Sequence, residues 1–457
     1  MPITANIPGI FPAELSRDAR AIQAQATSLT AFVGAAERGP LDEPVAVRDF
    51  PSFVRTFGES EREGAIGGAV REFFANGGIE AVAVRVARGA RPARLARGAV
   101  KLSAASAGAW GNQLRLRLRL GLDGTFHLQV RDGVTGRIET HQDLCFDDSA
   151  RRIDRVVNAR SQLVRWTAEP PKAEAVLLEH AREPRAGKTT WSDDECSTKV
   201  EPAGRGSNGC DLSLGDFASA AKEASHQGLY ALERADLFNL LVIPAYRPGK
   251  PVEPALWRAA ASYCARRRAF LLVEPCFLER LGLANANAAV FFSAEGEPPS
   301  SAAVAGLLAR TDAQRGPWRA PVGLGAALAA PRSLAGCDLS ADGFPDDRGH
   351  VAVRRTSLFL EESLRRGTRW AAFEPNAEPL WRELRARVTD FLDGLHRQGA
   401  FAGSRADEAY FVTCGEDTTS PADLAHGRVN LVVGFAPVRP GEFATVSLAL
   451  AAGQSVD

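Results

Sequence analysis

The sequence carries no excess charge of either sign. Lysine and arginine together number 55, and aspartate and glutamate together also number 55. Proteins that bind nucleic acid or anionic membranes by electrostatic attraction usually carry a basic excess, so this balance supports neither kind of partner. The 457 residues are 45% hydrophobic. That is enough to bury a large core, and the length suggests two or three domains.

Long hydrophobic runs and a leader segment are also lacking. The longest apolar stretches, such as residues 237–246, are far too short to span a bilayer. The chain starts with MPITANIPGIF, which lacks the basic start and the apolar run of a signal peptide. We therefore expect a soluble protein that is made in a cytoplasm.

Motifs for metal binding and catalysis are missing as well. Seven cysteines are scattered without a C-x-x-C pair, which argues against a disulfide framework and a structural zinc site. The histidines stand alone, and no G-x-S-x-G, H-E-x-x-H or G-x-G-x-x-G motif occurs. Gly187-Lys188-Thr189 matches the end of a P-loop, but Arg182 occupies the position of the motif's first glycine. The sequence therefore predicts no cofactor and no metal.

One carboxylate has a position that catalytic residues often take. Glu274 ends the predicted strand AFLLVE, and α/β enzymes frequently place catalytic groups at strand ends. No second carboxylate or histidine is linked to it by spacing, which favours a helix cap or a loop hydrogen bond. An α/β enzyme with a site near Glu274 is kept as a distant alternative.

The order of predicted elements indicates an α/β (α+β) protein. Strands are expected from Thr30 and over residues 80–87, with a helix starting at Gly67 between them. Residues 237–275 show strand, helix and strand, the pattern of a parallel βαβ unit. After a helix over 351–368, the sequence predicts a strand in RWAAFEP.

A change of composition near residue 88 indicates a domain boundary. The stretch QLRLRLRLGL (113–122) then alternates leucine with arginine, which predicts a half-exposed antiparallel strand with its arginines in water rather than a nucleic-acid site. Residues 182–210 are polar, rich in glycine and proline and without periodicity, so we expect a long or partly disordered loop there.

Both ends of the chain have extended character. Residues 1–20 contain three prolines and no helical period. Near the other end, Phe443–Leu450 alternates as a strand does, and Pro440-Gly441 separates it from the preceding stretch. A strand needs a neighbour for its backbone N–H and C=O groups. The pattern alone leaves open whether this strand returns to its own domain or pairs with another copy.

Several long blocks occur in order along about two-thirds of the chain. They are PGIF (8–11), TSLTAFVGAAERGPLDEPVAVRDFPSFVRTFG (27–58), AVREFFANGGIEAVAVRVA (69–87), SAGAWGNQLRLRL (106–118), VAGLLARTDAQRGPWRAPVG (304–323), the stretch 351–403, EAYFVTC and GRVNLVVGFAPVRPGEFATVSL. Together they resemble the contractile tail sheath proteins of bacteriophages and related contractile injection systems.

This resemblance implies a sheath core with a mixed β-sheet and flanking helices. Residues 21–90 and 211–440 would form the core, 91–210 an inserted β-rich outer domain, and 1–20 and 441–457 terminal arms. In this family such arms enter neighbouring subunits and complete a shared sheet. The residues expected to do so here are Phe443, Val446, Leu448, Leu450, Ile7, Ile10 and Phe11.

The function implied by the resemblance is structural and not enzymatic. The subunit would polymerise helically around an inner tube and contract to drive the tube through a target envelope. Its partners would be further copies, the inner tube, baseplate and cap proteins, and sheath paralogues. Assembly would take place in a bacterial cytoplasm, and the product would be a phage tail or a tail-like particle, including particles released from the cell.

Two details refine this expectation. The helix predicted over 377–398 has a polar face, on which Arg382, Arg385 and Arg397 are candidates for inner-tube contact. Many relatives carry a strand pair ending in a motif like WGARTL, which residues 324–350 lack. A specialised end-ring paralogue with limited contraction is therefore the alternative.

Overall fold

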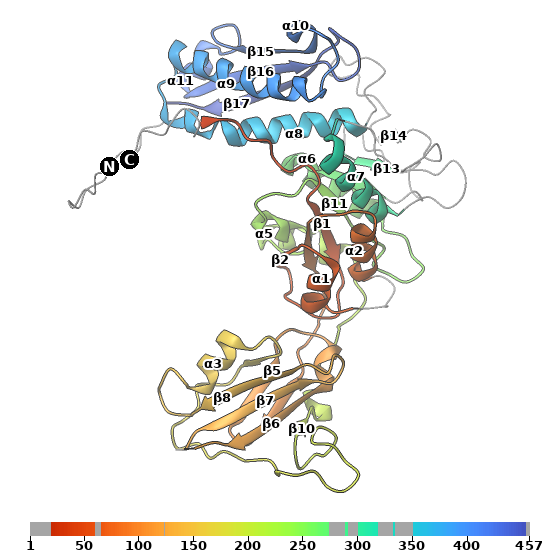
Figure 1. Cartoon of the computed structure of the whole chain (residues 1–457), viewed down its shortest axis with the longest axis vertical. Helices are drawn as coiled ribbons and strands as arrows, with labels where there is room; N and C mark the ends of the chain where they lie inside the picture. The colour runs from red at the N-terminus through yellow and green to blue at the C-terminus, as the bar shows by residue number, and fades with distance from the viewer. Residues whose placement is uncertain are drawn as a thin grey trace, which may run out of the picture.

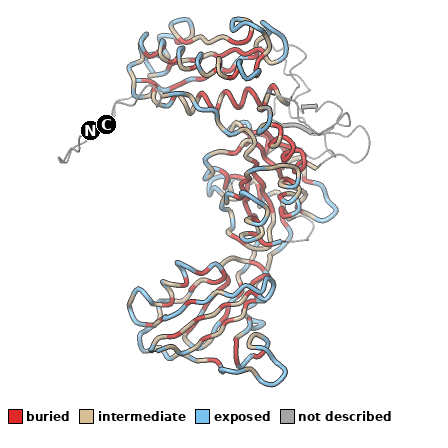
Figure 2. The backbone as a smooth tube through the Cα atoms, in the orientation of Figure 1, coloured by how far each residue is buried: buried red, intermediate tan, exposed pale blue. Residues whose placement is uncertain are grey.

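The molecule consists of three bodies arranged along its long axis (Figure 1). The computed structural model describes residues 20–59, 65–122, 124–273, 288–290, 300–318, 332–333 and 351–453. A β-rich lobe occupies one end, an α/β body the middle, and a smaller body of helices on a sheet the other end. Buried residues are concentrated inside each body, as Figure 2 shows. No helix in the described ranges combines the length and the apolar character that a membrane span requires.

The middle body is built on a seven-stranded sheet in the order β14-β13-β12-β11-β1-β3-β2. Its strands are β1 (Thr30–Gly34), β2 (Pro44–Val47), β3 (Ala81–Arg85), β11 (Leu240–Val242), β12 (Phe270–Val273), β13 (Ala288–Val290) and β14 (Arg332–Ser333). The strands from β13 to β3 are parallel, and the two edge strands are antiparallel. Because β1 pairs with both β3 and β11, the sheet joins two distant parts of the chain. The predicted α/β class with a mixed sheet is confirmed.

Helices cover both faces of this sheet. One face packs against α1 (Phe50–Phe57), α2 (Ile66–Ala75) and α7 (Ser301–Arg315). The other packs against α6 (Pro254–Arg267) and the 3-10 segment η4 (Gly228–Arg234), near the short helices α4 (Leu214–Phe217) and α5 (Ala220–Ala224). Strand β1 shows why both layers are needed, since Phe32 faces one and Val33 the other. Strands buried on both faces read as continuous apolar runs, as these do.

The β-rich lobe is an insertion that leaves and re-enters the middle body at one place. Backbone bridges join Arg88 to Cys210 and Arg91 to Ser207 at its base. One sheet contains β4 (Arg94–Arg97), β5 (Val100–Ala104) and β9 (Val164–Trp166). The other contains β10 (Thr198–Lys199), β6 (Leu114–Leu120), β7 (Phe126–Asp132) and β8 (Ile138–Leu144), with helix α3 (Ile153–Arg160) and the 3-10 segment η2 (Ala109–Gln113) beside them. Its hydrophobic cluster draws only on residues between Ala93 and Val200.

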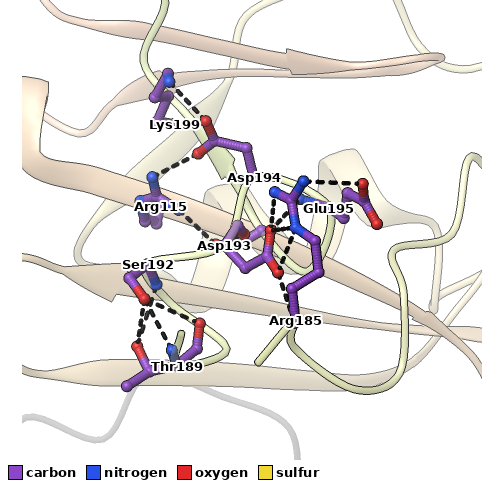
Figure 3. A network of polar contacts seen from close by, with 9 residues as sticks. Arg115, Arg185, Thr189, Ser192, Asp193, Asp194, Glu195 and Lys199 are labelled. Atoms are coloured by element: carbon purple, nitrogen blue, oxygen red, sulfur yellow. Dashed lines mark hydrogen bonds and ion pairs between the residues drawn. The ribbon is translucent and has the colours of Figure 1, made fainter. Parts of the chain in front are cut away.

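Strand β6 has the predicted alternation, but its arginines are not simply in water. Leu114, Leu116 and Leu118 are buried, and the arginines between them face residues 176–199, which we call the cover segment. Three contacts join the two: Arg115 to Asp194 at 2.7 Å, Arg119 to Glu179 at 3.0 Å, and Arg117 to the Arg182 carbonyl oxygen at 2.9 Å. Figure 3 shows Asp194 between Arg115 and Lys199. The cover segment thus supplies the acceptors that adjacent guanidinium groups need, and this fixes a largely irregular stretch in place.

His180 also attaches the cover segment to β6. It is 2% exposed, its Nδ1 accepts the backbone N–H of Leu118 at 3.0 Å, and its Nε2 lies 2.9 Å from Thr198 Oγ1. Since a backbone N–H can only donate, Nδ1 must be unprotonated and Nε2 carries the proton. Burial, reinforced by the nearby Arg97, lowers the pKa of His180 to about 4.

The smaller end body combines helices with a three-stranded sheet. Its elements are α8 (Val351–Gly367), the 3-10 segment η8 (Arg369–Phe373), α9 (Glu378–Arg397), α10 (Ala406–Ala409), β15 (Tyr410–Cys414), α11 (Pro421–Ala425), β16 (Arg428–Phe435) and β17 (Ala444–Ala451). Helix α8 belongs to two bodies, because Leu358 packs in the middle body and Leu360 in the end body. The prediction of a strand in RWAAFEP is wrong. These residues form the 3-10 segment η8, which continues from the end of α8. In it, the Ala371 N–H donates to the Thr368 carbonyl oxygen.

Acid should weaken the attachment of the cover segment through His180. An unfolded histidine has a pKa of about 6.5 and the folded one about 4, so the unfolded state binds the proton first as the pH falls. The contribution of His180 to the free energy of unfolding is complete above pH 6.5. It should decline by about 3 kcal/mol as the pH falls to about 4. Urea unfolding at a series of pH values measures this.

The matched variant is His180→Gln, which keeps an acceptor and a donor but does not titrate in this range. We expect its stability to depend less on pH between 6.5 and 4 than that of the wild type. Equal pH dependence in the two proteins would contradict the role given to His180.

Candidate assembly site

The last strand lies beside β16 of its own chain. β17 pairs with β16 in antiparallel register from Phe435 opposite Ala444 to Arg428 opposite Ala451. Its side chains alternate strictly between buried and exposed, as the period of two in a strand requires. The buried set is Ala444, Val446, Leu448 and Leu450, and the exposed set is Thr445, Ser447, Ala449 and Ala451.

In the single chain, therefore, residues 444–451 do not form an extended arm. Val446, Leu448 and Leu450 belong to the same hydrophobic cluster as α8 and α9. Full burial of such a side chain contributes roughly 1.5–3 kcal/mol, which explains why an isolated chain keeps the strand. Phe443 precedes β17, and its ring meets that of Phe411 edge-on at 5.1 Å. Pairing of this strand with another copy stays a prediction.

β17 is nevertheless an edge strand on an exposed joint. The sheet order is β15-β16-β17, so one side of β17 has no strand beside it within the described part of the chain. Val438 is 47% exposed, and Pro440 and Gly441 are exposed too. Gly441 has a φ of 77°, in the left-handed region that glycine adopts at little cost. An unpaired strand edge can accept a strand of another copy, and an exchanged element needs a connection through which it can leave its own domain.

The two described chain ends meet at Glu374, directly after η8. The Arg20 guanidinium donates to the Glu374 carboxylate at 2.8 Å and lies over the Trp370 ring at 4.7 Å. The Gly453 N–H donates to the Glu374 carbonyl oxygen at 2.8 Å. Arg20 and Gly453 thus lie at one place on the end body. The candidate residues Ile7, Ile10 and Phe11 lie outside the described residues.

Residues 20–29 run beside α8 from the middle body to the end body, and we call them the N-terminal strap (Figure 1). The Gln25 N–H donates to Ser363 Oγ at 3.1 Å. Arg355 and Asp312 form a buried ion pair, and Arg355 also donates to the Thr27 carbonyl oxygen at 2.9 Å. Thr27 Oγ1 also donates to Asp312 at 2.6 Å, so the strap is hydrogen-bonded to both members of the pair that joins α7 to α8.

Helix α9 presents the face predicted for inner-tube contact. Its apolar side is buried as the periodicity predicts. Arg382 and Arg397 are 73% and 76% exposed, and Arg397 pairs with Asp393 one turn away. Arg385 differs from them because, besides its ion pair with Glu378, it donates to the Cys414 carbonyl oxygen at the end of β15. Arg385 therefore joins the helix to the sheet, and the two exposed arginines remain the candidates for an outside partner.

The residues considered for catalysis or nucleotide binding do not form a common site within the described part of the chain. Glu274 lies outside the described residues. Gly187 and Lys188 lie in a turn of the cover segment, where the Lys188 N–H bonds to the Arg185 carbonyl oxygen. A P-loop instead connects a strand to a helix. Among the described residues, no cluster of His, Cys, Asp and Glu has the arrangement of a metal site.

Comparison with solved structures identifies the fold, although no family model and no curated protein matches the sequence. A sheath tail protein from Listeria innocua aligns over 95% of this chain and 97% of its own, with a TM-score of 0.57 and 12% identity. One from Desulfitobacterium hafniense aligns over 97% and 100%, with a TM-score of 0.56 and 13% identity. The chain has the tail sheath fold.

A third match has the same character. A chain of the anti-feeding prophage baseplate in the contracted state aligns over 97% of this chain and 98% of its own, with a TM-score of 0.50 and 19% identity. The tail sheath fold therefore extends over nearly the whole chain, with little similarity in sequence. The sequence resemblance and the structural likeness agree on the fold.

The place of β17 in its own core can be tested with Leu448→Ala. Leu448 is 6% exposed and lies in the cluster under α8 and α9. Truncating a buried leucine leaves a cavity, so the free energy of unfolding should fall by about 2–5 kcal/mol. The neighbouring Ala449→Ser, on the exposed side, should change it by about 0.5 kcal/mol or less. Equal effects in denaturant unfolding of the monomer would contradict this packing.

Proposed function

We propose that this protein is the structural subunit of a contractile sheath, which polymerises helically around an inner tube and shortens to drive the tube through a target envelope. The main support is the tail sheath fold over nearly the full length of the chain. Further copies of the chain, an inner tube protein, baseplate and cap proteins and sheath paralogues are the partners that this role requires. The particle is a phage tail or a tail-like injection device.

The proposed link between subunits is exchange of β17. The strand leaves its own β16 and pairs with β16 of a neighbouring copy, in the register that the single chain shows. Since the same backbone hydrogen bonds form and the same side chains are buried, exchange changes the free energy of the strand very little. The cost of association is offset by the other contacts between copies. The residues that hold the strand on its own sheet would therefore also hold it on the sheet of a neighbouring copy.

The proposed link suits a lattice that must move. Both described ends of the chain lie on the end body near Glu374, so connections at either end would act on one small body. The exposed joint between β16 and β17 absorbs changes of angle while the shared sheet stays intact. Each subunit then needs only a small free-energy difference between its extended and shortened packings, because repetition over many copies makes the total large.

A reversible disulfide tests strand exchange directly. Val432 of β16 and Ser447 of β17 lie opposite each other on the outer side of the sheet, so Val432→Cys and Ser447→Cys place two thiols across one strand pair. Oxidation of the monomer before assembly should fix β17 on its own chain and prevent the formation of helical tubes seen by electron microscopy. Reduction should restore them.

The same double variant gives a second readout after assembly. Tubes formed under reducing conditions and then oxidised should give covalent ladders of subunits on a non-reducing gel, because the paired cysteines belong to different copies. The single variant Val432→Cys is the control for bonds to natural cysteines. Tubes that yield only uncrosslinked or internally crosslinked monomers would rule out exchange. Short rings in place of tubes would favour an end-ring subunit.

Helix α9 is the proposed contact with the inner tube, through Arg382 and Arg397. Reversing both charges (Arg382→Glu and Arg397→Glu) should change monomer stability by about 1 kcal/mol or less, because exposed ion pairs contribute little. Co-sedimentation with the inner tube of the same particle should fall markedly. Arg48→Glu, at an 87% exposed side chain of the middle body, is the control. Unchanged binding by the double variant would refute this contact.

A further inference from the structure

The order of strands in the middle body creates a crevice at one edge of the sheet. β1 and β11 are parallel neighbours, but the chain continues from β1 towards β3 on one side and from β11 towards β12 on the other. The connections also lie on opposite faces, with α1 and α2 on one and α6 on the other. In open α/β sheets, the space beyond the carboxyl ends of strands at such a switch point is the preferred place for a ligand.

A cavity of about 680 Å³ lies at this position. Ala35 and Ala36 follow β1, Val86 follows β3, and Tyr246 comes soon after β11. The inserted lobe closes the other side with residues that include Trp110, Asp132 and Thr135. Small-molecule sites commonly have volumes of about 300–1,000 Å³ and mix apolar walls with a few polar groups, as here.

The wall between the two bodies is rigidly built. Arg85 is 1% exposed and donates to the carbonyl oxygens of Ala36, Glu37 and Gly39, so it fixes the loop that follows β1. Arg38, which follows Glu37 in this loop, forms an ion pair with the buried carboxylate of Asp132 in the lobe at 3.2 Å. The cavity is therefore shaped by the fold before any ligand arrives.

The charges around the cavity favour a cation. Its described lining residues include the acidic Glu37, Glu59, Asp132 and Asp211, with Arg38 as their basic counterpart. Asp132 is already satisfied by Arg38, Thr135 and the Val134 N–H. The carboxylate of Glu37 accepts no hydrogen bond from any described residue, and burial raises its pKa. Arg38 and Arg85 lie near enough to act on its charge, but a partly buried carboxylate that accepts no hydrogen bond is further stabilised by an ammonium group placed beside it.

The backbone next to Glu37 strengthens this preference. A Cβ placed on Gly58 would lie 2.8 Å from Glu37 Oε2, so the carboxylate lies against the residue that ends α1. The carboxyl end of a helix carries partial negative charge and favours cations. Aromatic faces attract cations as well, and Trp110 and Tyr246 are both in the cavity wall.

We propose that this cavity binds a small organic cation, with its ammonium group on the Glu37 carboxylate and its hydrocarbon part against Trp110 and Tyr246. The cavity lies between the middle body and the inserted lobe, whereas β17 and α9 belong to the end body (Figure 1).

Calorimetric titration of the full-length monomer with three four-carbon probes of similar size tests the proposal. n-Butylamine should bind saturably with a dissociation constant of about 1 mM or tighter, while 1-butanol and butyrate should not. Glu37→Gln should weaken amine binding about tenfold or more. Glu80→Gln, a half-exposed carboxylate at the opposite end of β3, should leave it unchanged. Absence of saturable amine binding, or equal binding by 1-butanol or by Glu37→Gln, would overturn the site.

The pH dependence of amine binding by the wild type gives a second measurement that does not require a variant. Protonation of Glu37 removes the charge that attracts the amine, so binding should weaken as the pH falls through the raised pKa of Glu37. The other charged groups near Glu37 are Arg38, Asp132 and Arg85, and the cavity wall also contains Glu59 and Asp211. Affinity that does not change with pH would also overturn the proposal.

Discussion

The parallel pairing of β1 with β3 on one side and β11 on the other is the contact on which the molecule depends. It joins residues 30–34 to residues 81–85 and to residues 240–242, although more than half of the intervening chain folds elsewhere. Because the lobe leaves and returns through neighbouring backbone bridges, it adds a separate core without disturbing the sheet. The sheet can therefore stay constant while the lobe varies, and the same edge of the sheet creates the cavity between them.

A second constraint acts at the other end of the molecule. Every strand must satisfy its backbone groups, and β17 does so on its own β16 in the isolated chain. Its buried leucines and valine would be equally buried on the same sheet of a neighbour, so one sequence is compatible with both arrangements. The strap on α8 brings the N-terminal end of the described chain to the same place. The end body therefore holds both described ends of the chain.

Arginine is used throughout as a connector within the chain. Arg85 organises a loop through carbonyl oxygens, Arg355 holds the strap, and the arginines of β6 bind the cover segment. Arg385 joins α9 to β15. These arginines are ties between elements within the described part of the chain, whereas the side chains of Arg382 and Arg397 are largely exposed. This distinction narrows the candidates for an outside partner on α9 to Arg382 and Arg397.

The sequence by itself determined the elements that depend on local periodicity. The strand at Thr30, the helix through Val70 and Phe73, the βαβ unit, the alternation in β6 and the long helix α9 all follow from the spacing of apolar residues. The long blocks that resemble sheath proteins indicated the fold, and the structural likeness agrees. RWAAFEP was mistaken for a strand because a short apolar run has too few residues to show a period.

Only the tertiary structure determined which segments these elements pair with and pack against. The alternation in Ala444–Ala451 indicated a strand but did not specify its partner, since a pleat has the same period beside any neighbour. The leucine–arginine pattern of β6 could not reveal the acidic cover segment, which lies more than 50 residues further along the chain. The crevice beside Glu37 likewise depends on the order of strands in the sheet. The spacing of residues along the chain does not show which distant segments pair, because those pairings depend on the packing of the whole molecule.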